Sequence, residues 1–295
     1  MVTTGPIGKI SACGIDWVTA SSPPDGRDMQ LLACAGHILE QEEAAGHELE
    51  RVRWQRYDLK VCGGVSAGLR EDGAIVRLSG ATAQAHWREL IPYARNVSRL
   101  DVQVTTDMGP GHDRMGAQHL RAALHHRRTR GGQWRVSFQG GPSGVETVYL
   151  GRRTSETFAR LYNKYAESED PRWLHNWRYE VEVKKPLAVD LARFLYHHSD
   201  PQLACQLYVY DYFSARGVKP AYACSGSDVQ LRSHRDPTSA ERTLRWWDEQ
   251  VAGVYARLAP KVGDARLLAA LGARGEGPGA RDPGHVAGGP DDGNE

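Results

Sequence analysis

A tyrosine set between basic residues is the part of this sequence best suited to chemistry. The segment Val145 to Tyr165 reads VETVYLGRRTSETFARLYNKY, which predicts two short strands joined by a Gly-Arg-Arg-Thr-Ser turn. In the second stretch, Glu156 to Lys164, a strand would project Arg160, Tyr162 and the final lysine from one face. Neighbouring positive charge favours the phenolate over the neutral phenol, whose pKa is ordinarily about 10, and can also hold a phosphate diester. The pattern therefore predicts Tyr162 as a nucleophile, although a solvated strand face would carry the same residues.

Carboxylates that could bind a metal ion stand on two other predicted strands. In the strand from Val97 to Thr105, Asp101 shares one face with the polar residues that follow it at intervals of two. In WRYEVEVKK, from Trp177 to Lys185, Glu180 and Glu182 lie side by side on one face. If the two strands are neighbours, the three carboxylates could bind a divalent cation, whose charge offsets their repulsion. A hydrogen-bonded structural aspartate and a solvated edge strand remain the alternatives.

Three short stretches of the sequence resemble motifs of one family and follow one another in the same order as in that family. YLGRRTSETFARLYNK resembles the nucleophile motif of the replication initiation factors, which comprise the trans-acting initiators of rolling-circle plasmids, phage initiators and related conjugative relaxases. RLD at Arg99 to Asp101 and WRxExE at Trp177 to Glu182 match further motifs of that family. The resemblance extends over about residues 99–185. It departs from the family at Thr105, where many plasmid members carry a second acid, and around residues 212–235 no string matches the origin-recognition region.

The resemblance implies a mechanism. Tyr162 would attack one DNA strand at an origin, leaving a 5′-phosphotyrosyl bond and a free 3′-OH, and the reverse reaction would religate the strand. Magnesium or manganese on Asp101, Glu180 and Glu182 would hold the non-bridging oxygens. Four basic residues would steady the phosphate: Arg153, Arg160, Lys164 and Arg178. The sequence has no His-x-His pair of the kind that binds metal in many other tyrosine nickases, which favours a carboxylate-based site.

Two other functions are consistent with the same residues. The chain could be a DNA-binding regulator that does not nick, or a relaxase-like protein, of a plasmid, phage or conjugative element. It could also be a metal-dependent nuclease in which water attacks and Tyr162 is structural. For the nicking reading, the family implies a host helicase as a partner and a possible homodimer. The first predicted strand starts near Cys13, too early for a preceding helix-turn-helix, which favours a minimal plasmid or phage initiator.

A basic stretch offers a second place for DNA to bind. The net charge of the chain is only +1, so any nucleic-acid partner must be met by a local patch. Residues 114–144 contain six arginines and no acid. A solvated helix and a phosphate-binding surface explain this stretch equally well. Four of its arginines form the possible DNA surface: Arg121, Arg127, Arg128 and Arg130.

Composition indicates an ordinary cytoplasmic protein. The five cysteines are scattered, without a CxxC pair or zinc-ligand spacing, and are expected to be reduced thiols. No apolar run approaches the roughly 18 residues needed to span a bilayer. The N-terminus lacks a charged start followed by an apolar core, so we expect no secretion signal.

Periodicity predicts an α+β fold. We expect an antiparallel sheet with helices on one face and the carboxylate and tyrosine site on the open face. Residues 1–185 would form the catalytic domain, 186–271 a helical C-terminal part continuous with it, and 272–295, which are rich in Gly, Pro, Asp and Arg, a disordered tail. Further predicted strands cover 13–20, 51–58, 60–66, 74–78 and 133–139, and predicted helices cover 29–48, 82–95, 186–198, 202–215 and 238–258.

Overall fold

The structure is a computed structural model that describes residues 8–54, 57–112, 115–130, 134–141 and 144–222. The chain divides into two compact units, Met1–Leu231 and Arg232–Glu295, and every described residue belongs to the first. The predicted helix at 238–258 and the predicted tail at 272–295 lie outside the described residues. The predicted boundaries at 185 and 271 stay predictions.

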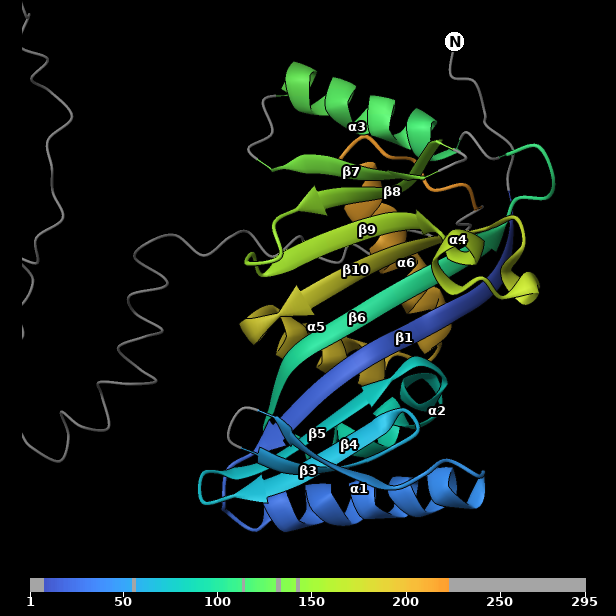
Figure 1. Cartoon of the computed structure of the whole chain (residues 1–295). Coiled ribbons are helices and arrows are strands. Elements are labelled where there is room, and N and C mark those ends of the chain that lie inside the picture. Colours follow the sequence, from blue (N-terminus) through green and yellow to red (C-terminus); the bar gives the residue numbers. More distant parts are fainter. Residues whose placement is uncertain (1–7, 55–56, 113–114, 131–133, 142–143, 223–295) are drawn as a thin grey trace, which may run out of the picture. The chain divides into compact units, whose positions relative to one another are not determined.

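The described unit is built on one ten-stranded sheet in which every pair of neighbours is antiparallel (Figure 1). The order across the sheet is β2-β3-β4-β5-β1-β6-β10-β9-β8-β7. The strands are β1 (Lys9–Ser22), β2 (Glu50–Trp54), β3 (Tyr57–Cys62), β4 (Val65–Arg70), β5 (Gly73–Ser79), β6 (Asn96–Asp107), β7 (Val136–Gly141), β8 (Gly144–Gly151), β9 (Thr157–Asn163) and β10 (Asn176–Lys184). The long strands β1, β6 and β10 lie in the middle.

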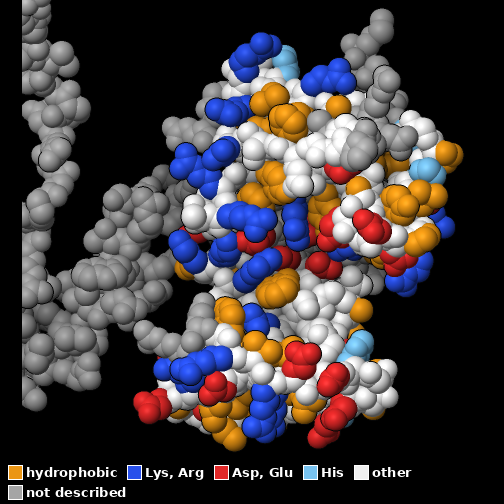
Figure 2. Space-filling view, viewed as in Figure 1, with side chains coloured by type: hydrophobic (Ala, Val, Ile, Leu, Met, Phe, Trp, Pro, Cys, Tyr) orange, Lys and Arg blue, Asp and Glu red, His pale blue; other side chains and the backbone are white. Residues whose placement is uncertain are grey.

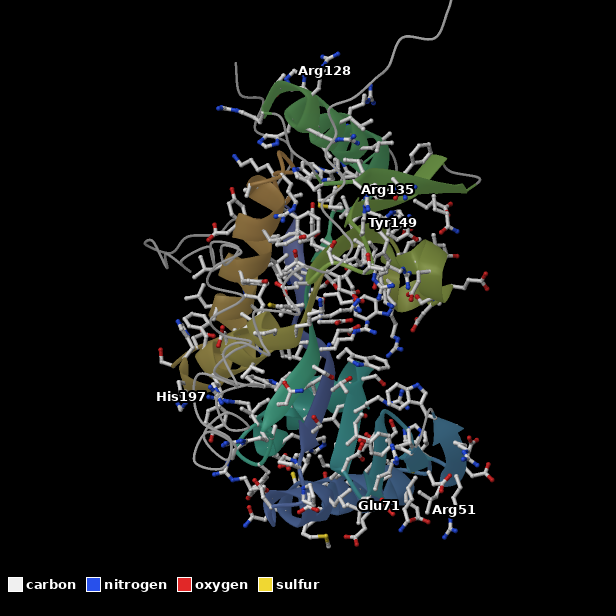
Figure 3. All side chains as sticks on the ribbon, turned by 90° about the vertical axis from the view of Figure 1, so that its left-hand side faces the viewer. Arg51, Glu71, Arg128, Arg135, Tyr149 and His197 are labelled. Carbon is white, nitrogen blue, oxygen red and sulfur yellow. The ribbon has the colours of Figure 1, made fainter. Side chains whose placement is uncertain are left out.

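Five helices pack on one face of this sheet. They are α1 (Arg27–Ala44), α2 (Gly80–Leu90), α3 (Met115–Arg130), α5 (Lys185–His197) and α6 (Pro201–Ser214). The short helix α4 (Lys164–Ser168) and the 3₁₀ turn η1 (Pro171–Trp173) connect β9 to β10. Figure 3, which turns the molecule by 90°, places Tyr149 of β8 and His197 of α5 on opposite sides of the sheet. The predicted α+β architecture, an antiparallel sheet with helices on one face, is confirmed.

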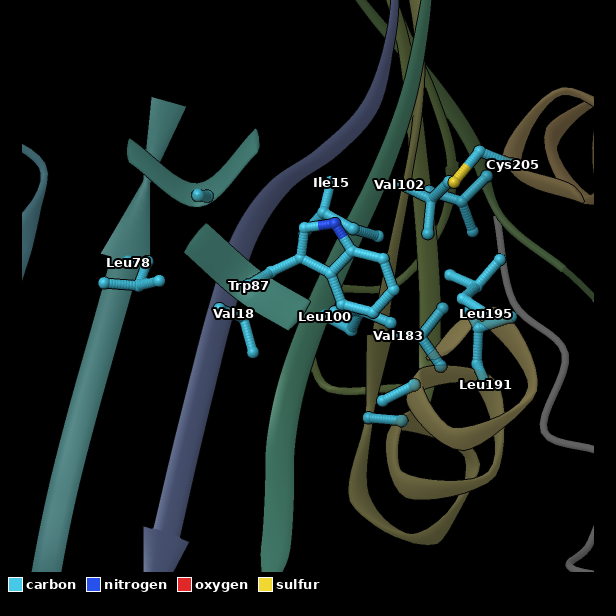
Figure 4. Close-up of a cluster of buried hydrophobic side chains, with 14 of the residues drawn as sticks. Ile15, Val18, Leu78, Trp87, Leu100, Val102, Val183, Leu191, Leu195 and Cys205 are labelled. Atoms are coloured by element: carbon cyan, nitrogen blue, oxygen red, sulfur yellow. The ribbon is translucent and has the colours of Figure 1, made fainter. Parts of the chain in front are cut away.

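The buried core forms between the sheet and these helices. Alternate residues of the central strands point into it, among them Leu100 and Val102 of β6 and Val183 of β10, none of them exposed. In Figure 4, Trp87 of α2 packs against Leu100, with residues of α5 and α6 close by. Strand alternation therefore assigns every second residue of β6 and β10 to the opposite face, which the helices leave uncovered.

The predicted elements differ from the structure mainly at their ends. The expected strand 51–58 corresponds to β2 and the start of β3, and 60–66 is shared between β3 and β4 around a turn at Gly63, whose φ is 53°. The expected strand 156–164 ends one residue early, because the Asn163 side chain accepts hydrogen bonds from the backbone N–H groups of Tyr165 and Ala166 and so starts α4. Lys164 is thus the first residue of a helix.

A bulge in β1 changes which of its residues face the helices. The pairing with β6 shifts between Ile15 and Trp17, so Asp16 is an extra residue without its own partner. Ile15 on one side of the bulge and Val18 on the other are both buried in the core. Asp16 and Trp17 therefore both project to the face that the helices leave uncovered. Simple alternation would have sent only one of them there.

None of the helices in the described ranges is both long enough and apolar enough to cross a membrane.

Candidate functional site

The uncovered face of β9, β10, β6 and β1 carries a set of polar and charged side chains, which we call the charged face. Strand register aligns its members in rows across the sheet. The rows are Tyr162–Arg178–Thr105, Arg160–Glu180–Gln103, Phe158–Glu182–Asp101–Trp17 and Lys184–Arg99–Thr19. Figure 2 shows basic and acidic side chains gathered over the middle of this face. The three sequence motifs, far apart in the chain, thus meet on adjacent strands.

Tyr162 lies beneath cations on this face. It is 4% exposed, and its hydroxyl donates a hydrogen bond of 3.1 Å to Oε2 of Glu180. The Arg160 guanidinium carbon lies 5.2 Å from the centre of its ring, and Nζ of Lys164 lies 5.9 Å from it. The phenol is therefore flanked by the two cations that strand alternation suggested, with a carboxylate bonded directly to its oxygen.

The pKa of Tyr162 moves in the direction opposite to the one expected from the sequence. Burial raises it above its ordinary value, and the negative charge of Glu180 raises it further. Arg178 and Arg160 lower the pKa, but not enough to offset burial. The residue is a neutral phenol near neutral pH, so any nucleophilic role requires a base that removes its proton during the reaction. The sequence pattern shows the neighbouring cations but does not show that the Tyr162 phenol is buried.

Glu180 connects this tyrosine to Arg160. It is 1% exposed, and its second oxygen, Oε1, accepts a hydrogen bond of 2.7 Å from Nη2 of Arg160. One carboxylate oxygen thus accepts the hydrogen bond of the phenol, while the other accepts one from a guanidinium. This arrangement fixes the carboxylate where it can exchange a proton with Tyr162.

Asp101 and Glu182 share a guanidinium. Arg99 donates to both oxygens of Asp101, with Nε 2.8 Å from Oδ1, and its Nη2 lies 3.1 Å from Oε2 of Glu182. Lys184 pairs with the other oxygen of Glu182. Burial raises the pKa of Asp101 to about 7, although Arg99 opposes this rise. Arg99 was not among the predicted site residues, but its spacing of two from Asp101 was a readable sign that both occupy one strand face.

Arg178 stands beside Tyr162 in the same row and is held from two sides. Its Nε donates to the Thr105 hydroxyl at 2.9 Å, and its Nη1 lies 3.1 Å from Oδ1 of Asp16. Thr105, the position where the family resemblance fails, is thus an anchor for this guanidinium. Asp16 was missed because the sequence gives no clear sign of the β1 bulge, which lets Asp16 and Trp17 both occupy this face.

Gln103 contributes a buried donor. Its Oε1 accepts a hydrogen bond of 2.8 Å from the Thr105 hydroxyl, whose oxygen already accepts from Arg178, and this fixes the orientation of the amide. The side-chain nitrogen is buried and has no hydrogen-bond partner among the described residues. A free N–H group in this position suits an anionic oxygen, such as one from a phosphate.

The three predicted metal ligands do not fit a metal ion as they stand. Oxygen is the donor that magnesium and manganese prefer, and Asp101 and Glu182 are close enough to share Arg99. However, each carboxylate already contacts a cation, and Glu180 is engaged by Tyr162 and Arg160. Within the described ranges, no three His, Cys, Asp or Glu side chains are grouped so that they could hold an ion. A divalent cation could join Asp101 to Glu182 only after displacing Arg99.

The remaining predicted phosphate ligands lie at the edges of the site. Lys164, on α4, pairs with Glu167 at 2.5 Å while lying over the Tyr162 ring. Arg153, in the β8–β9 turn, places its guanidinium 5.5 Å from the centre of the Phe158 ring. The turn itself begins at Gly151, whose φ of 98° favours glycine.

The four arginines of the possible DNA surface are not brought to Tyr162. All are exposed on α3, which packs on β7 and β8 from the helix-covered side. Arg128 lies at the outer end of that helix in Figure 3. Their role as a DNA surface stays a prediction about a separate region: Arg121, Arg127, Arg128 and Arg130.

Comparisons with known proteins assign no family. No protein-family model matches the chain, and no curated protein matches it. Among solved structures, it is similar to a rolling circle replication initiator protein from Geobacillus stearothermophilus, with 17% identity and a TM-score of 0.44. That similarity covers 62% of this chain and 77% of the other. A likeness at this level is too low to assign either fold or function, so the proposal below is based on side-chain geometry and on the sequence motifs.

Proposed function

We propose that this protein is a rolling-circle replication initiator that nicks and religates one DNA strand at an origin through a covalent bond to Tyr162. The observation that carries the proposal is the hydrogen bond from the Tyr162 hydroxyl to Glu180, within a face lined by guanidinium groups. The three motifs shared with the replication initiation factors support the same reaction. Charge and geometry alone would support any phosphoryl transfer, and the motifs favour DNA as the substrate.

Glu180 would act as the base in this reaction. As the Tyr162 oxygen attacks phosphorus, its proton passes to Glu180, with which it is already hydrogen-bonded. The bond from phosphorus to the 3′ oxygen breaks, and that oxygen takes a proton from water to become the free 3′-OH. Attack by the 3′-OH on the phosphotyrosine reverses each step and closes the strand. The bond energy is retained in the phosphotyrosine, so no external energy source is required.

Cations on the charged face would stabilise the transition state. Arg160 lies two residues from Tyr162 on β9 and Arg178 lies beside it on β10, while Gln103 on β6, whose side-chain N–H has no partner among the described residues, is in the same row as Arg160. Donors that are fixed before the reaction stabilise developing charge without reorganising. Because Tyr162 is only 4% exposed, DNA must move part of the cover formed by Arg160 and Lys164, whose charges suit the phosphate.

Magnesium or manganese dependence is a separate part of the proposal. The paired carboxylates give it no direct support, and no step above depends on a metal. If the reaction needs a divalent cation, that cation must compete with Arg99 for Asp101 and Glu182. A cytoplasmic location, a host helicase and a homodimer likewise remain predictions that follow from the proposed function.

The experiment that tests the proposal captures the covalent intermediate. Purified protein is incubated with a random single-stranded DNA library, with magnesium, with manganese or with a chelator, and then denatured. DNA that stays attached is digested, and the modified peptide is identified by mass spectrometry. We expect the adduct on the tryptic peptide Leu161–Lys164, at Tyr162, and its loss in Tyr162→Phe.

Tyr179→Phe is the matched control. Tyr179 is a neighbouring buried tyrosine that faces the helices, so its loss should leave the adduct in place. An adduct on another residue, or one that persists in Tyr162→Phe, would overturn the proposal. Nicking without any adduct would favour the metal-dependent nuclease, and DNA binding without nicking would favour the regulator of a mobile element.

A further inference from the structure

Pairs of arginine and aromatic side chains cross the sheet on the same side as Tyr162 and continue well beyond it. Arg153 lies over Phe158 at the β8–β9 end, and Arg99 lies over Trp17, with its guanidinium carbon 4.7 Å from the ring centre. Farther along, Arg77 of β5 lies 4.4 Å from the ring centre of Trp54 in β2. We call these three pairs the arginine–aromatic row: Arg153/Phe158, Arg99/Trp17 and Arg77/Trp54.

Strand register shows that the row is continuous with the charged face. Thr19 of β1 pairs with Arg99 on one side and with Arg77 on the other, so both arginines point to the same side of the sheet. Phe158 and Trp17 occupy the neighbouring row, separated from it by two residues along the strands. Phe158 and Trp17 therefore lie in one row, with Glu182 and Asp101 between them, about 7 Å from the row of Arg99 and Arg77. The row of Arg77 reaches β2 at Glu50, so Trp54 belongs to neither row and meets Arg77 by contact of their side chains.

Two of the three arginines have no carboxylate partner among the described residues. Within the described part of the chain, no ion pair joins Arg77 or Arg153 to an acid, whereas Arg99 is paired with Asp101 and Glu182. Arg77 makes a hydrogen bond of 3.1 Å to the Ser66 hydroxyl, and partial burial lowers its pKa. A guanidinium held against a ring, partly withdrawn from water and without an anion, suits a phosphate.

We propose that the arginine–aromatic row binds single-stranded DNA that continues from the nick site, with arginines on phosphates and rings stacked on bases. The inference deepens the proposed function, on which it rests, by assigning the path of the substrate beyond the scissile phosphate. Aromatic rings stack on the faces of unpaired bases, whereas in a duplex these faces are buried between neighbouring base pairs. Three pairs of rings and cations, spread across the sheet from β9 to β2, therefore fit a single strand better than a double helix.

Equilibrium binding tests this path without requiring cleavage. In a Tyr162→Phe background, fluorescence anisotropy measures binding of labelled oligothymidylate, alone and as a duplex, over a range of salt concentrations. Trp54→Leu should weaken single-strand binding about tenfold, because stacking of one base supplies an effect of this order. The salt dependence of binding by Trp54→Leu should equal that of the parent protein, because this substitution removes no charge. Arg77→Gln should weaken binding and reduce the slope of log K against log salt by about 0.7, the contribution of one phosphate contact on a single strand.

Two more variants keep the test decisive. Arg77→Lys retains the charge and should restore the salt slope, which a purely structural role for Arg77 would not predict. Arg51→Gln removes an exposed arginine from the opposite side of β2 and should bind like the parent protein. The row is disproved if Trp54→Leu and Arg77→Gln bind oligothymidylate as the parent does, or if Trp54→Leu weakens duplex and single-strand binding equally. If these variants bind normally but wild-type protein forms the adduct at Tyr162, the row is disproved and the nicking proposal stands. If the variants weaken binding as expected but no adduct forms, the row stands as a DNA-binding surface and the nicking proposal fails.

Discussion

Two buried tyrosines on neighbouring strands, one on each face of the sheet, differ in what their hydroxyl groups contact. Tyr162 on the charged face and Tyr179 on the helix-covered face both have a pKa raised by burial. Tyr162 donates its proton to a carboxylate that a guanidinium holds. The Tyr179 hydroxyl instead contacts His119 at 3.2 Å and accepts from the backbone N–H of Ala221. The same phenol is thus bonded to a buried carboxylate on one face and to a histidine and a backbone N–H on the other, which is why the proposed function uses Tyr162 and not Tyr179.

The largest effect that would sharpen this comparison comes from Glu180. Glu180→Gln keeps the shape of the side chain but cannot accept the proton of Tyr162. Adduct formation should slow by about 10²- to 10⁴-fold, the range for loss of a general base. Single-turnover kinetics on the captured DNA measure the rate. An unchanged rate would show that Glu180 only orients the phenol, and Tyr179→Phe supplies the baseline for the opposite face.

Asp16 should have a smaller effect, through Arg178. Asp16→Asn weakens one of the two contacts that hold the guanidinium beside Tyr162. We expect the rate to fall about 10- to 100-fold, since a hydrogen bond to a charged group contributes about 1.5–3 kcal/mol. The double variant with Arg178→Gln should be no slower than Arg178→Gln alone. Additive losses would separate Asp16 from Arg178.

Arg99 should control the affinity of the charged face for divalent cations. Arg99→Gln frees Asp101 and Glu182 from a shared cation. Binding of manganese, followed by its electron paramagnetic resonance signal, should tighten by up to about a thousandfold, because a unit charge about 4 Å away contributes about 4 kcal/mol at an effective dielectric constant of 20. Arg88→Gln on α2 is the control from the helix-covered side. Equal manganese affinity in all three proteins would remove Arg99 from any part in metal binding.

The two faces should also differ in how pH affects stability. The pKa of Asp101 is about 7 in the folded protein, above its ordinary 3.8, so the folded state retains a proton that the unfolded chain has lost. Its contribution to stability therefore falls as the pH rises from about 4 to 7. Burial lowers the pKa of His119 to about 4, so its contribution rises with pH between about 4 and 6.5.

Urea unfolding of Asp101→Asn and His119→Gln between pH 4 and 7 measures both contributions. The unfolding free energy of Asp101→Asn should depend on pH more positively than that of the wild type. That of His119→Gln should depend on pH less positively. Parallel profiles for the two variants would show that burial does not act on these groups in opposite directions.

Much of this architecture was readable from the sequence because β6 and β10 alternate strictly. The apolar residues of those strands predicted a covered face, and Asp101, Glu180 and Glu182 were correctly assigned to one strand face each. The sequence did not show that β6 and β10 are neighbours in the sheet, because strand pairing and register depend on partners far away in the chain. The α+β class followed from periodicity alone.

What the sequence could not provide was the pairing of charges. Counting cations near Tyr162 suggested a lowered pKa, whereas burial, which depends on packing, determines the direction. Three nearby acids suggested a metal site, whereas the guanidinium of Arg99 lies between two of them. Lys164 was expected on a strand and starts a helix, because Asn163 caps α4. The pKa of Tyr162 and the helix at Lys164 are decided by neighbours rather than by spacing, and the metal site stays a prediction.

The bulge in β1 has a consequence for how this strand can change over time. In a regular strand, successive side chains point to opposite faces of the sheet, so two consecutive residues cannot both face solvent. The additional residue at position 16 lets the strand present two successive side chains outward and still return Val18 to the interior. Deletion of Asp16 would turn the side chains that precede it in β1, such as Ile15, to the opposite face of the sheet. We therefore expect sequences of this fold to tolerate substitutions at 16 far more readily than a deletion there.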